Sequence, residues 1–128
     1  MIGQQQKDQA EKWFKDLRDK ICEEFEILEE DHLKLAPKSD MAAKKFERKS
    51  TIRETDDKED GGGGVMATLK GGRIFEKVGV NVSAVYGKLA PEAQKSITAR
   101  KAIPELKDDP RFWASGISLV AHMRNPHT

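Results

Sequence analysis

The sequence has little of several features that define common protein classes. Its 128 residues include one cysteine and carry a net charge of +1. A single cysteine excludes an internal disulfide and fits a reducing compartment, so we expect a cytoplasmic protein. It also excludes a cysteine-based metal cluster and leaves three histidines as imidazole ligands. Because the net charge is close to zero, composition gives no electrostatic case for binding nucleic acid.

Long hydrophobic runs and common site signatures are also missing. No apolar run approaches the length of a bilayer-spanning helix, and the N-terminus has no apolar secretory core. We therefore expect no stable insertion into a membrane. The glycine run is not followed by Lys-Ser or Lys-Thr, and no Gly-x-Gly-x-x-Gly, His-Glu-x-x-His or Cys-x-x-Cys motif occurs. The motifs thus indicate no nucleotide or redox cofactor, and the length predicts one domain or part of one.

Residues 4 to about 33 are predicted to form a long amphipathic helix. Apolar residues recur there at three- and four-residue spacing, which places them on one face of a helix. They are Ala10, Trp13, Phe14, Leu17, Ile21, Phe25 and Leu28. The other side carries charges of both signs, which is not typical of a helix on a membrane surface. We expect the apolar stripe to pack on the core.

The middle of the chain predicts short strands and a flexible segment. Residues 46–52 are expected to form a short strand. Residues 54–64 are charged and end in four glycines, a composition that favours a mobile loop. The alternative is a glycine tract that lets the backbone approach a ligand closely. Residues 65–69 are predicted as a strand, and Gly-Gly at 71–72 as the turn of a hairpin.

Two later segments show the two-residue period of half-buried strands, residues 74–86 and 112–122. In each, apolar residues occupy one face, and glycine or polar residues dominate the other. The polar candidates are Asn81, Ser83, Ser118 and His122. The last two face the same way, roughly 13 Å apart along the strand. We infer a sheet with one side on a core and the other lining a polar ligand pocket.

Residues 91–102 between these strands predict a second helix, which Pro91 would begin. The order is therefore helix, strands, helix and strand, with a tight hairpin among the strands. This order predicts an α+β fold in which helices flank an antiparallel sheet.

Three residues near the end of the chain are candidates for ligand chemistry. His122 could hold a metal ion or a proton near neutral pH, and a structural or merely exposed histidine is the alternative. We expect Ser118 to donate a hydrogen bond rather than act as a nucleophile, because the Gly-x-Ser-x-Gly elbow is absent. Arg124 lies in a predicted loop, where a guanidinium group suits a carboxylate, although an ordinary surface arginine fits as well.

Four segments together resemble oxygen-dependent coproporphyrinogen III oxidases. They are Gly-Gly-Gly-Gly-Val-Met at 61–66, Arg-Ile-Phe-Glu-Lys-Val-Gly-Val-Asn-Val-Ser at 73–83, Ala-Ser-Gly-Ile-Ser-Leu-Val-Ala-His at 114–122 and Arg-Asn-Pro-His at 124–127. They occur in the order of that family. This chain has Tyr86 at a position where many members have histidine, and in this respect it resembles the alphaproteobacterial branch.

The resemblance implies a flat antiparallel sheet with helices on both sides, and a homodimer. It implies oxidative decarboxylation of two propionates of a tetrapyrrole to vinyl groups, with molecular oxygen as the electron acceptor. It implies no organic cofactor, and in bacterial members a divalent metal such as manganese. Ser118 matches a substrate-contacting serine, and His122 matches a histidine assigned to the metal. Asn81 and Ser83 fall in the Gly-Val-Asn-x-Ser motif.

The chain departs from the family pattern at its end. The family continues through Pro-x-x-His and Asn-x-Arg, so the proton-donor histidine is expected beyond Thr128 and the catalytic residue is unknown here. We interpret residues 1–128 as the N-terminal part of one oxidase domain, with little activity alone. One alternative is a non-catalytic tetrapyrrole-binding or dimerisation module, and another is a structural α+β domain. The latter leaves the polar strand faces unexplained.

Overall fold

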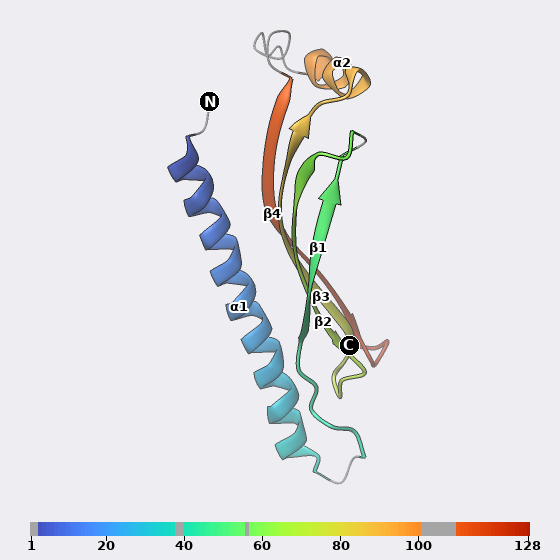
Figure 1. The fold of residues 1–128 in the computed structure, drawn as a ribbon. Coiled ribbons are helices and arrows are strands. Elements are labelled where there is room, and N and C mark those ends of the chain that lie inside the picture. Colours follow the sequence, from blue (N-terminus) through green and yellow to red (C-terminus); the bar gives the residue numbers. More distant parts are fainter. Residues whose placement is uncertain (1–2, 38–39, 56, 101–109) are drawn as a thin grey trace.

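A long helix lies along one face of a four-stranded antiparallel sheet (Figure 1). The computed structural model describes residues 3–37, 40–55, 57–100 and 110–128. Its elements are α1 (Gln4–Leu35), β1 (Glu47–Glu54), β2 (Asp60–Lys70), β3 (Phe75–Lys88), α2 (Pro91–Arg100) and β4 (Arg111–Met123). The strands lie side by side in the order β1-β2-β3-β4. The predicted α+β class and antiparallel sheet are therefore confirmed.

The predicted elements agree with the structure apart from their ends. The helix predicted at 4–33 runs two residues further, and the strand predicted at 46–52 is β1. The strands predicted at 74–86 and 112–122 are β3 and β4. The helix predicted at 91–102 is α2, and its expected last two positions lie outside the described residues.

The core lies between α1 and the sheet face that carries the valines of β3. Val78 and Val80 are fully buried there, as is Leu69 of β2. From α1, Phe25 packs against this cluster and meets Phe75 edge to face, with ring centroids 4.8 Å apart. Aromatic pairs in this geometry stabilise a core by about 1 kcal/mol beyond simple burial.

The side of α1 that meets the sheet differs from the predicted stripe. Trp13 is 63% exposed and Leu28 is 48% exposed, so both were wrongly assigned to the core. The buried positions of α1 are Arg18, Cys22 and Glu29, which also recur at helical spacing. Two of these three are charged. Arg18 donates to Asp19 of the same helix, and Glu29 accepts backbone N–H groups of a distant turn. Because both charges have such partners, they can be buried on the side of α1 that we expected to be apolar.

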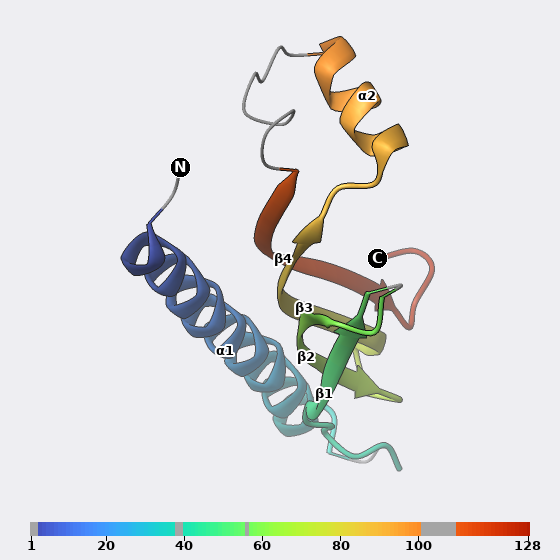
Figure 2. The same cartoon turned by 45° about the horizontal axis from the view of Figure 1, so that its top comes forward.

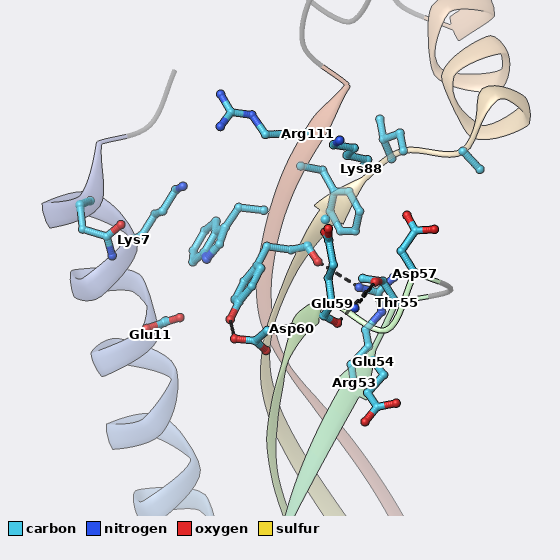
Figure 3. A pocket seen from close by; sticks show the side chains of 17 residues that line it. Lys7, Glu11, Arg53, Glu54, Thr55, Asp57, Glu59, Asp60, Lys88 and Arg111 are labelled. Carbon is cyan, nitrogen blue, oxygen red and sulfur yellow. Dashed lines mark hydrogen bonds between the residues drawn. The ribbon is translucent and has the colours of Figure 1, made fainter.

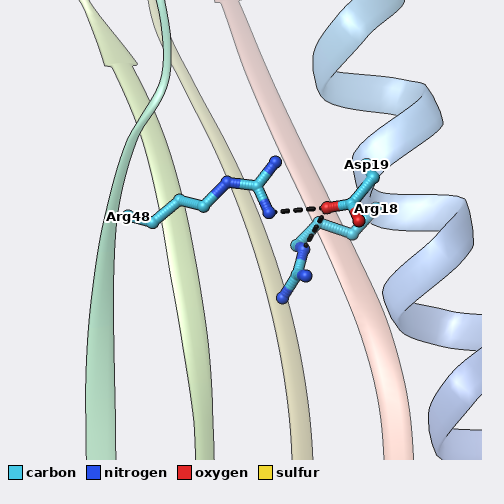
Figure 4. A network of polar contacts seen from close by, with 3 residues as sticks. All are labelled: Arg18, Asp19 and Arg48. Atoms are coloured by element: carbon cyan, nitrogen blue, oxygen red, sulfur yellow. Dashed lines mark hydrogen bonds and ion pairs between the residues drawn. The ribbon is translucent and has the colours of Figure 1, made fainter.

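Asp19 joins the middle of α1 to the first strand (Figure 4). Its Oδ1 accepts from Arg48 Nη1 at 2.5 Å and from Arg18 Nε at 3.1 Å. The hydrogen bond from Arg48 is the main reason that the pKa of Asp19 lies below its usual value. The side chains of Asp19 and Arg48 are about half exposed, so solvent screens this pair.

The carboxylate of Glu29 lies between the C-terminal part of α1 and the turn that joins β2 and β3. Glu29 is fully buried, and its Oε2 accepts the backbone N–H of Arg73 at 2.6 Å. Its Oε1 accepts the N–H groups of Ile74 and Phe75 at 3.0 and 3.1 Å. A Cβ on Gly72 would stand 2.5 Å from the same Oε1, so only glycine fits beside the carboxylate.

Arg73 secures the same junction from the other direction. Its side chain is almost fully buried, and its Nε donates to His32 Nδ1 at 3.0 Å. One terminal nitrogen donates to the carbonyl of Ala36 at 2.6 Å, and the other donates to the carbonyl of Met41. The guanidinium thus supplies donors to the C-terminal end of α1, where helix carbonyls lack partners.

The glycine run belongs to a strand, which corrects its assignment to a mobile loop. Residues 61–64 lie in β2, where Gly63 and Gly64 pair with β1 on one side and with β3 on the other, and Gly62 pairs with β3. A Cβ on Gly62, Gly63 or Gly64 would lie within 2.2 Å of a carbonyl oxygen of a neighbouring strand. Composition alone suggested mobility, but the glycines serve close approach of three backbones.

The two faces of the sheet differ in what covers them. The α1 helix lies against the valine face, and α2 lies beyond the end of the strands (Figure 2). No helix covers the opposite face within the part of the chain that the structure describes. Helices on both faces, which the resemblance implied, are thus seen on one face only among these residues. In the same described residues, no helix is long and apolar enough to cross a membrane.

Candidate functional site

The uncovered face of the sheet brings most of the predicted site residues together. Asn81 of β3 is the direct cross-strand partner of Ser118 of β4. Ser83, two positions along, pairs with Gly116, and Lys77 pairs with His122. Side chains of directly paired residues lie about 5 Å apart on the same face of a sheet. The two-residue period therefore predicted this shared face correctly.

The polar groups of this face are accessible. The side chain of Ser118 is exposed, and those of Asn81 and Ser83 are partly buried between strands. None of the three donates or accepts a side-chain hydrogen bond within the described ranges. Opposite them, the valines of β3 bury their side chains under α1. The sheet thus presents one hydroxyl and one amide side by side, both available to donate or accept bonds from a polar ligand.

His122 lies toward the end of this face, beside a small hollow of about 370 Å³ lined also by Lys70, Glu76 and Lys77. The described residues hold no group of three His, Cys, Asp or Glu side chains that could bind a metal ion. One imidazole beside two ammonium groups does not make a cation site. The described part of the chain therefore does not by itself fit the divalent metal that the resemblance implied.

Arg124 follows β4 and is anchored at the turn between β2 and β3. Its Nε donates to the carbonyl of Gly72 at 2.9 Å, and its backbone N–H donates to the carbonyl of Ile74 at 2.8 Å. Arg124 as a whole is exposed, and its two terminal nitrogens form no hydrogen bond with any described residue. The structure thus places Arg124 at the end of the sheet, one residue beyond Met123, which ends β4 and pairs with Phe75.

A separate cleft of about 1120 Å³ opens at the other end of the interface, between the start of α1 and the strand ends (Figure 3). Lys7 and Glu11 face it from the helix, and Arg53 and Asp60 face it from β1 and β2. None of the predicted site residues lines this cleft. Its charges are of both signs, so they favour neither an anionic nor a cationic ligand.

Tyr86 and Asp60 form a hydrogen-bonded pair in this cleft. The Tyr86 hydroxyl donates to Asp60 Oδ2 at 2.6 Å, and the N–H of Gly62 donates to Oδ1 at 3.0 Å. These bonds hold the pKa of Asp60 below its usual value, with the tyrosine as the larger cause. The same contact with the carboxylate raises the pKa of Tyr86.

Sequence reasoning missed Glu29 and Arg73, which build the junction at the opposite end. A signal was present for Glu29, because positions 18, 22, 25 and 29 lie on one side of a helix. Glu29 in that series can be recognised as a buried carboxylate only when its hydrogen-bond partners are known. Those partners lie more than forty positions along the chain, and no local pattern connects them.

Comparisons with known proteins agree with the resemblance seen in the sequence. The family model described as Coproporphyrinogen III oxidase matches residues 9–128. The oxygen-dependent coproporphyrinogen-III oxidases of Rickettsia peacockii (strain Rustic) and Rickettsia felis (strain ATCC VR-1525 / URRWXCal2) are each 44% identical over 120 residues, which is 94% of this chain and 38% of theirs. That of Rickettsia bellii (strain RML369-C) is 38% identical over 125 residues, which is 98% of this chain and 39% of its own.

The chain thus spans less than two fifths of the length of these curated relatives. The family model covers nearly all of it, including β3, β4 and the segment that holds Arg124. The segments that carry the resemblance in the sequence all fall inside this match. The chain belongs to the coproporphyrinogen III oxidase family.

Proposed function

We propose that this chain supplies the substrate-binding sheet of an oxygen-dependent coproporphyrinogen III oxidase. The observation that carries the proposal is the pairing of Asn81 with Ser118 on the uncovered polar face, in a chain that belongs to this family. We also propose that residues 1–128 are part of one oxidase domain. The continuous match over residues 9–128 supports this reading.

The proposed reaction removes carbon dioxide and two electrons from each of two propionates. For each, the carboxylate, a proton and one molecule of oxygen yield a vinyl group, carbon dioxide and hydrogen peroxide, so oxygen is the co-substrate. The breaking C–C bond leaves its electron pair in the new double bond while a hydride equivalent passes to oxygen. We propose no organic cofactor, because the electron-rich pyrrole can itself reduce oxygen.

The residues of this chain bind and orient the substrate in this proposal. Ser118 and Asn81 offer a hydroxyl and an amide to the polar edge of the tetrapyrrole, with Ser83 extending the row. The free end of Arg124 suits a propionate, because a guanidinium group binds a carboxylate through two parallel hydrogen bonds. Holding the propionate in one orientation lowers the entropic cost of reaching the reactive geometry.

In this proposal, His122 would supply at most one of the ligands of a metal ion. A divalent metal such as manganese would need further ligands from outside the described residues, so no step is assigned to it. A homodimer is part of the proposal, and the exposed Leu119 and Val120 on edge strand β4 support further packing there. The buried, unpaired Cys22 fits a reducing cytoplasm.

A chimera tests the proposed function directly. Residues 9–128 of this chain would replace the matched segment of the Rickettsia felis relative, and carbon dioxide release from coproporphyrinogen III would be measured in air. We expect activity in the chimera and little or none in the isolated chain. Ser118→Ala should lower kcat/KM about tenfold or more through the lost hydrogen bond. Ser50→Ala, on exposed strand β1, is the matched control and should change it little.

The chimera also tests the alternative of a non-catalytic tetrapyrrole-binding module. That alternative would use the same polar face, where Asn81 and Ser118 are paired, to bind a tetrapyrrole without turnover. A folded chimera without turnover would overturn the enzyme proposal. If the isolated chain then still bound coproporphyrin in a Ser118-dependent way, the module would become the leading function.

A further inference from the structure

The turn between β2 and β3 is held from two opposite sides by opposite charges. On the core side, the fully buried carboxylate of Glu29 accepts the N–H groups of Arg73, Ile74 and Phe75. On the other side, the carbonyls of Gly72 and Ile74 accept hydrogen bonds from Arg124. An anion and a cation therefore face each other across the backbone of one turn.

Two individual peptide groups connect these charges. The peptide between residues 72 and 73 donates its N–H to Glu29 at 2.6 Å and offers its C=O to Arg124 Nε at 2.9 Å. The peptide between residues 74 and 75 donates to Glu29 at 3.1 Å and accepts the backbone N–H of Arg124 at 2.8 Å. In a trans peptide the N–H and C=O point in opposite directions, so each group bridges the two side chains.

Such a bridge strengthens both of its hydrogen bonds. A carboxylate at the N–H end draws the peptide dipole toward itself, which makes the carbonyl oxygen a better acceptor for a guanidinium group. The bond from Arg124 Nε is partly buried, so water competes with it less than at an open surface. The charge on Glu29 therefore stabilises a hydrogen bond that Glu29 itself does not make.

The turn is also braced against movement toward or away from Glu29. A Cβ at Gly72 would stand 2.5 Å from the carboxylate, so the turn backbone passes Glu29 too closely for any side chain at this position. Arg73 ties the same turn to the C-terminal end of α1 through Ala36 and His32. The carbonyls that hold Arg124 consequently have little freedom.

From these contacts we propose that Glu29 is a positioning residue for Arg124. Acting through the two peptide groups, it fixes Nε of Arg124 and leaves the two terminal nitrogens directed to bind a ligand carboxylate. Where that carboxylate is a propionate of the tetrapyrrole, the inference rests on the proposed function. The positioning itself does not depend on which ligand binds.

The first test is NMR spectroscopy of the Arg124 side chain in the 128-residue chain without ligand. The Nε–H signal would be assigned with Arg124→Lys, and its hydrogen exchange measured in wild type and in Glu29→Gln. Glutamine preserves the volume but removes the charge and places an amide NH₂ near backbone donors. We expect exchange at Arg124 Nε to become about tenfold faster or more.

Two control variants separate positioning from general destabilisation. Val78→Ala removes buried core volume without touching the turn, and Glu30→Gln changes an exposed neighbour on α1. Both should leave the Arg124 Nε–H signal protected as long as the protein is folded. Equal loss of protection in Val78→Ala, or unchanged protection in folded Glu29→Gln, would overturn the proposal. If Glu29→Gln does not fold, Glu29→Asp, which keeps the charge with a shorter reach, takes its place and should give partial protection.

Titration with coproporphyrin, a stable propionate-bearing probe, tests the ligand part. Arg124→Lys should weaken binding about tenfold, and Glu29→Gln should weaken it by a smaller factor in the same direction. If exchange responds to Glu29→Gln but wild type binds no coproporphyrin, the proposed function fails while the positioning stands. If wild type binds and Glu29→Gln binds equally well, the ligand role of the positioning is refuted.

Discussion

The two ends of α1 meet the sheet in different ways. At the C-terminal end, Glu29 and Arg73 are buried and each makes three hydrogen bonds to its surroundings. At the N-terminal end, a cleft of about 1120 Å³ separates the helix from the strand ends, and Arg53 and Tyr86 reach into solvent. Charges are present at both ends, but only the buried ones are held by full sets of partners. The comparison shows that burial, rather than the number of charges, decides where the helix is fixed.

We expect the largest effect from Gly63→Ala. It tests whether the strands are closely packed even at the end of the sheet that lies beside the cleft. The new Cβ would stand 2.1 Å from the carbonyl oxygen of Thr51, which belongs to the backbone of β1. We expect a loss of at least about 3 kcal/mol in the free energy of unfolding. Gly116→Ala is the control, because its Cβ would meet nothing within 4 Å. Equal urea midpoints for the two variants would contradict the close packing of β2.

Arg73→Ala and Arg53→Ala compare the two ends directly. Removing Arg73 deletes a buried side chain and the three partly buried hydrogen bonds that it donates to His32, Ala36 and Met41, and we expect a cost of about 2 to 3 kcal/mol. Arg53 is exposed and donates to the carbonyl of Tyr86 at 3.0 Å, so its removal should cost less than about 1 kcal/mol. Urea unfolding monitored by circular dichroism measures both. A cost for Arg53→Ala as large as that for Arg73→Ala would break the comparison.

Asp19→Asn tests the exposed ion pair in the middle of the helix. Because the pKa of Asp19 is lower in the folded protein, its charge contributes stability above the unfolded value near pH 4, and this contribution is lost as pH falls through the folded pKa. We expect a difference from wild type of at most about 1 kcal/mol at pH 7. The difference should shrink toward zero as pH falls below the folded pKa of Asp19. Asp16→Asn, in an exposed pair within the helix, is the control and should change stability less.

The smallest effect on stability is expected from Tyr86→Phe at the open end. Both side chains of this pair lie at the surface, and Tyr86 is 38% exposed, so the variant should unfold at nearly the same urea concentration as wild type. Its signature is instead spectroscopic, because the chain has a single tyrosine. Tyrosinate absorbance should titrate above the usual pKa in wild type and return toward it in Asp60→Asn. An unchanged titration in Asp60→Asn would mean that the hydrogen bond does not persist in solution.

The sequence predicted the elements well where one local period governs them. The two-residue alternation in β3 and β4 placed Asn81 and Ser118 on one face without knowledge of their pairing. The same kind of argument failed for Trp13 and Leu28, because a broad apolar stripe on a helix does not say which flank meets the sheet. That choice depends on the partners of Arg18 and Glu29, which lie on the helix itself and on a turn far along the chain.

The glycine run and Arg124 show the same limit. Four glycines in a row are compatible with a mobile loop and with a close-packed strand, and only the carbonyls of the neighbouring strands decide between them. Arg124 was predicted as a loop residue able to bind a carboxylate. Its anchoring at Gly72 and Ile74 joins positions about fifty apart in the chain, which local patterns do not report.

The close packing of residues 61–64 has a consequence at the level of the gene. Any side chain at these positions meets an atom of a neighbouring strand at less than 3 Å. Every base change in the first or second place of a glycine codon introduces a side chain or a stop, whereas every change in the third place is silent. The DNA that encodes this strand should therefore accumulate substitutions almost only at third codon positions.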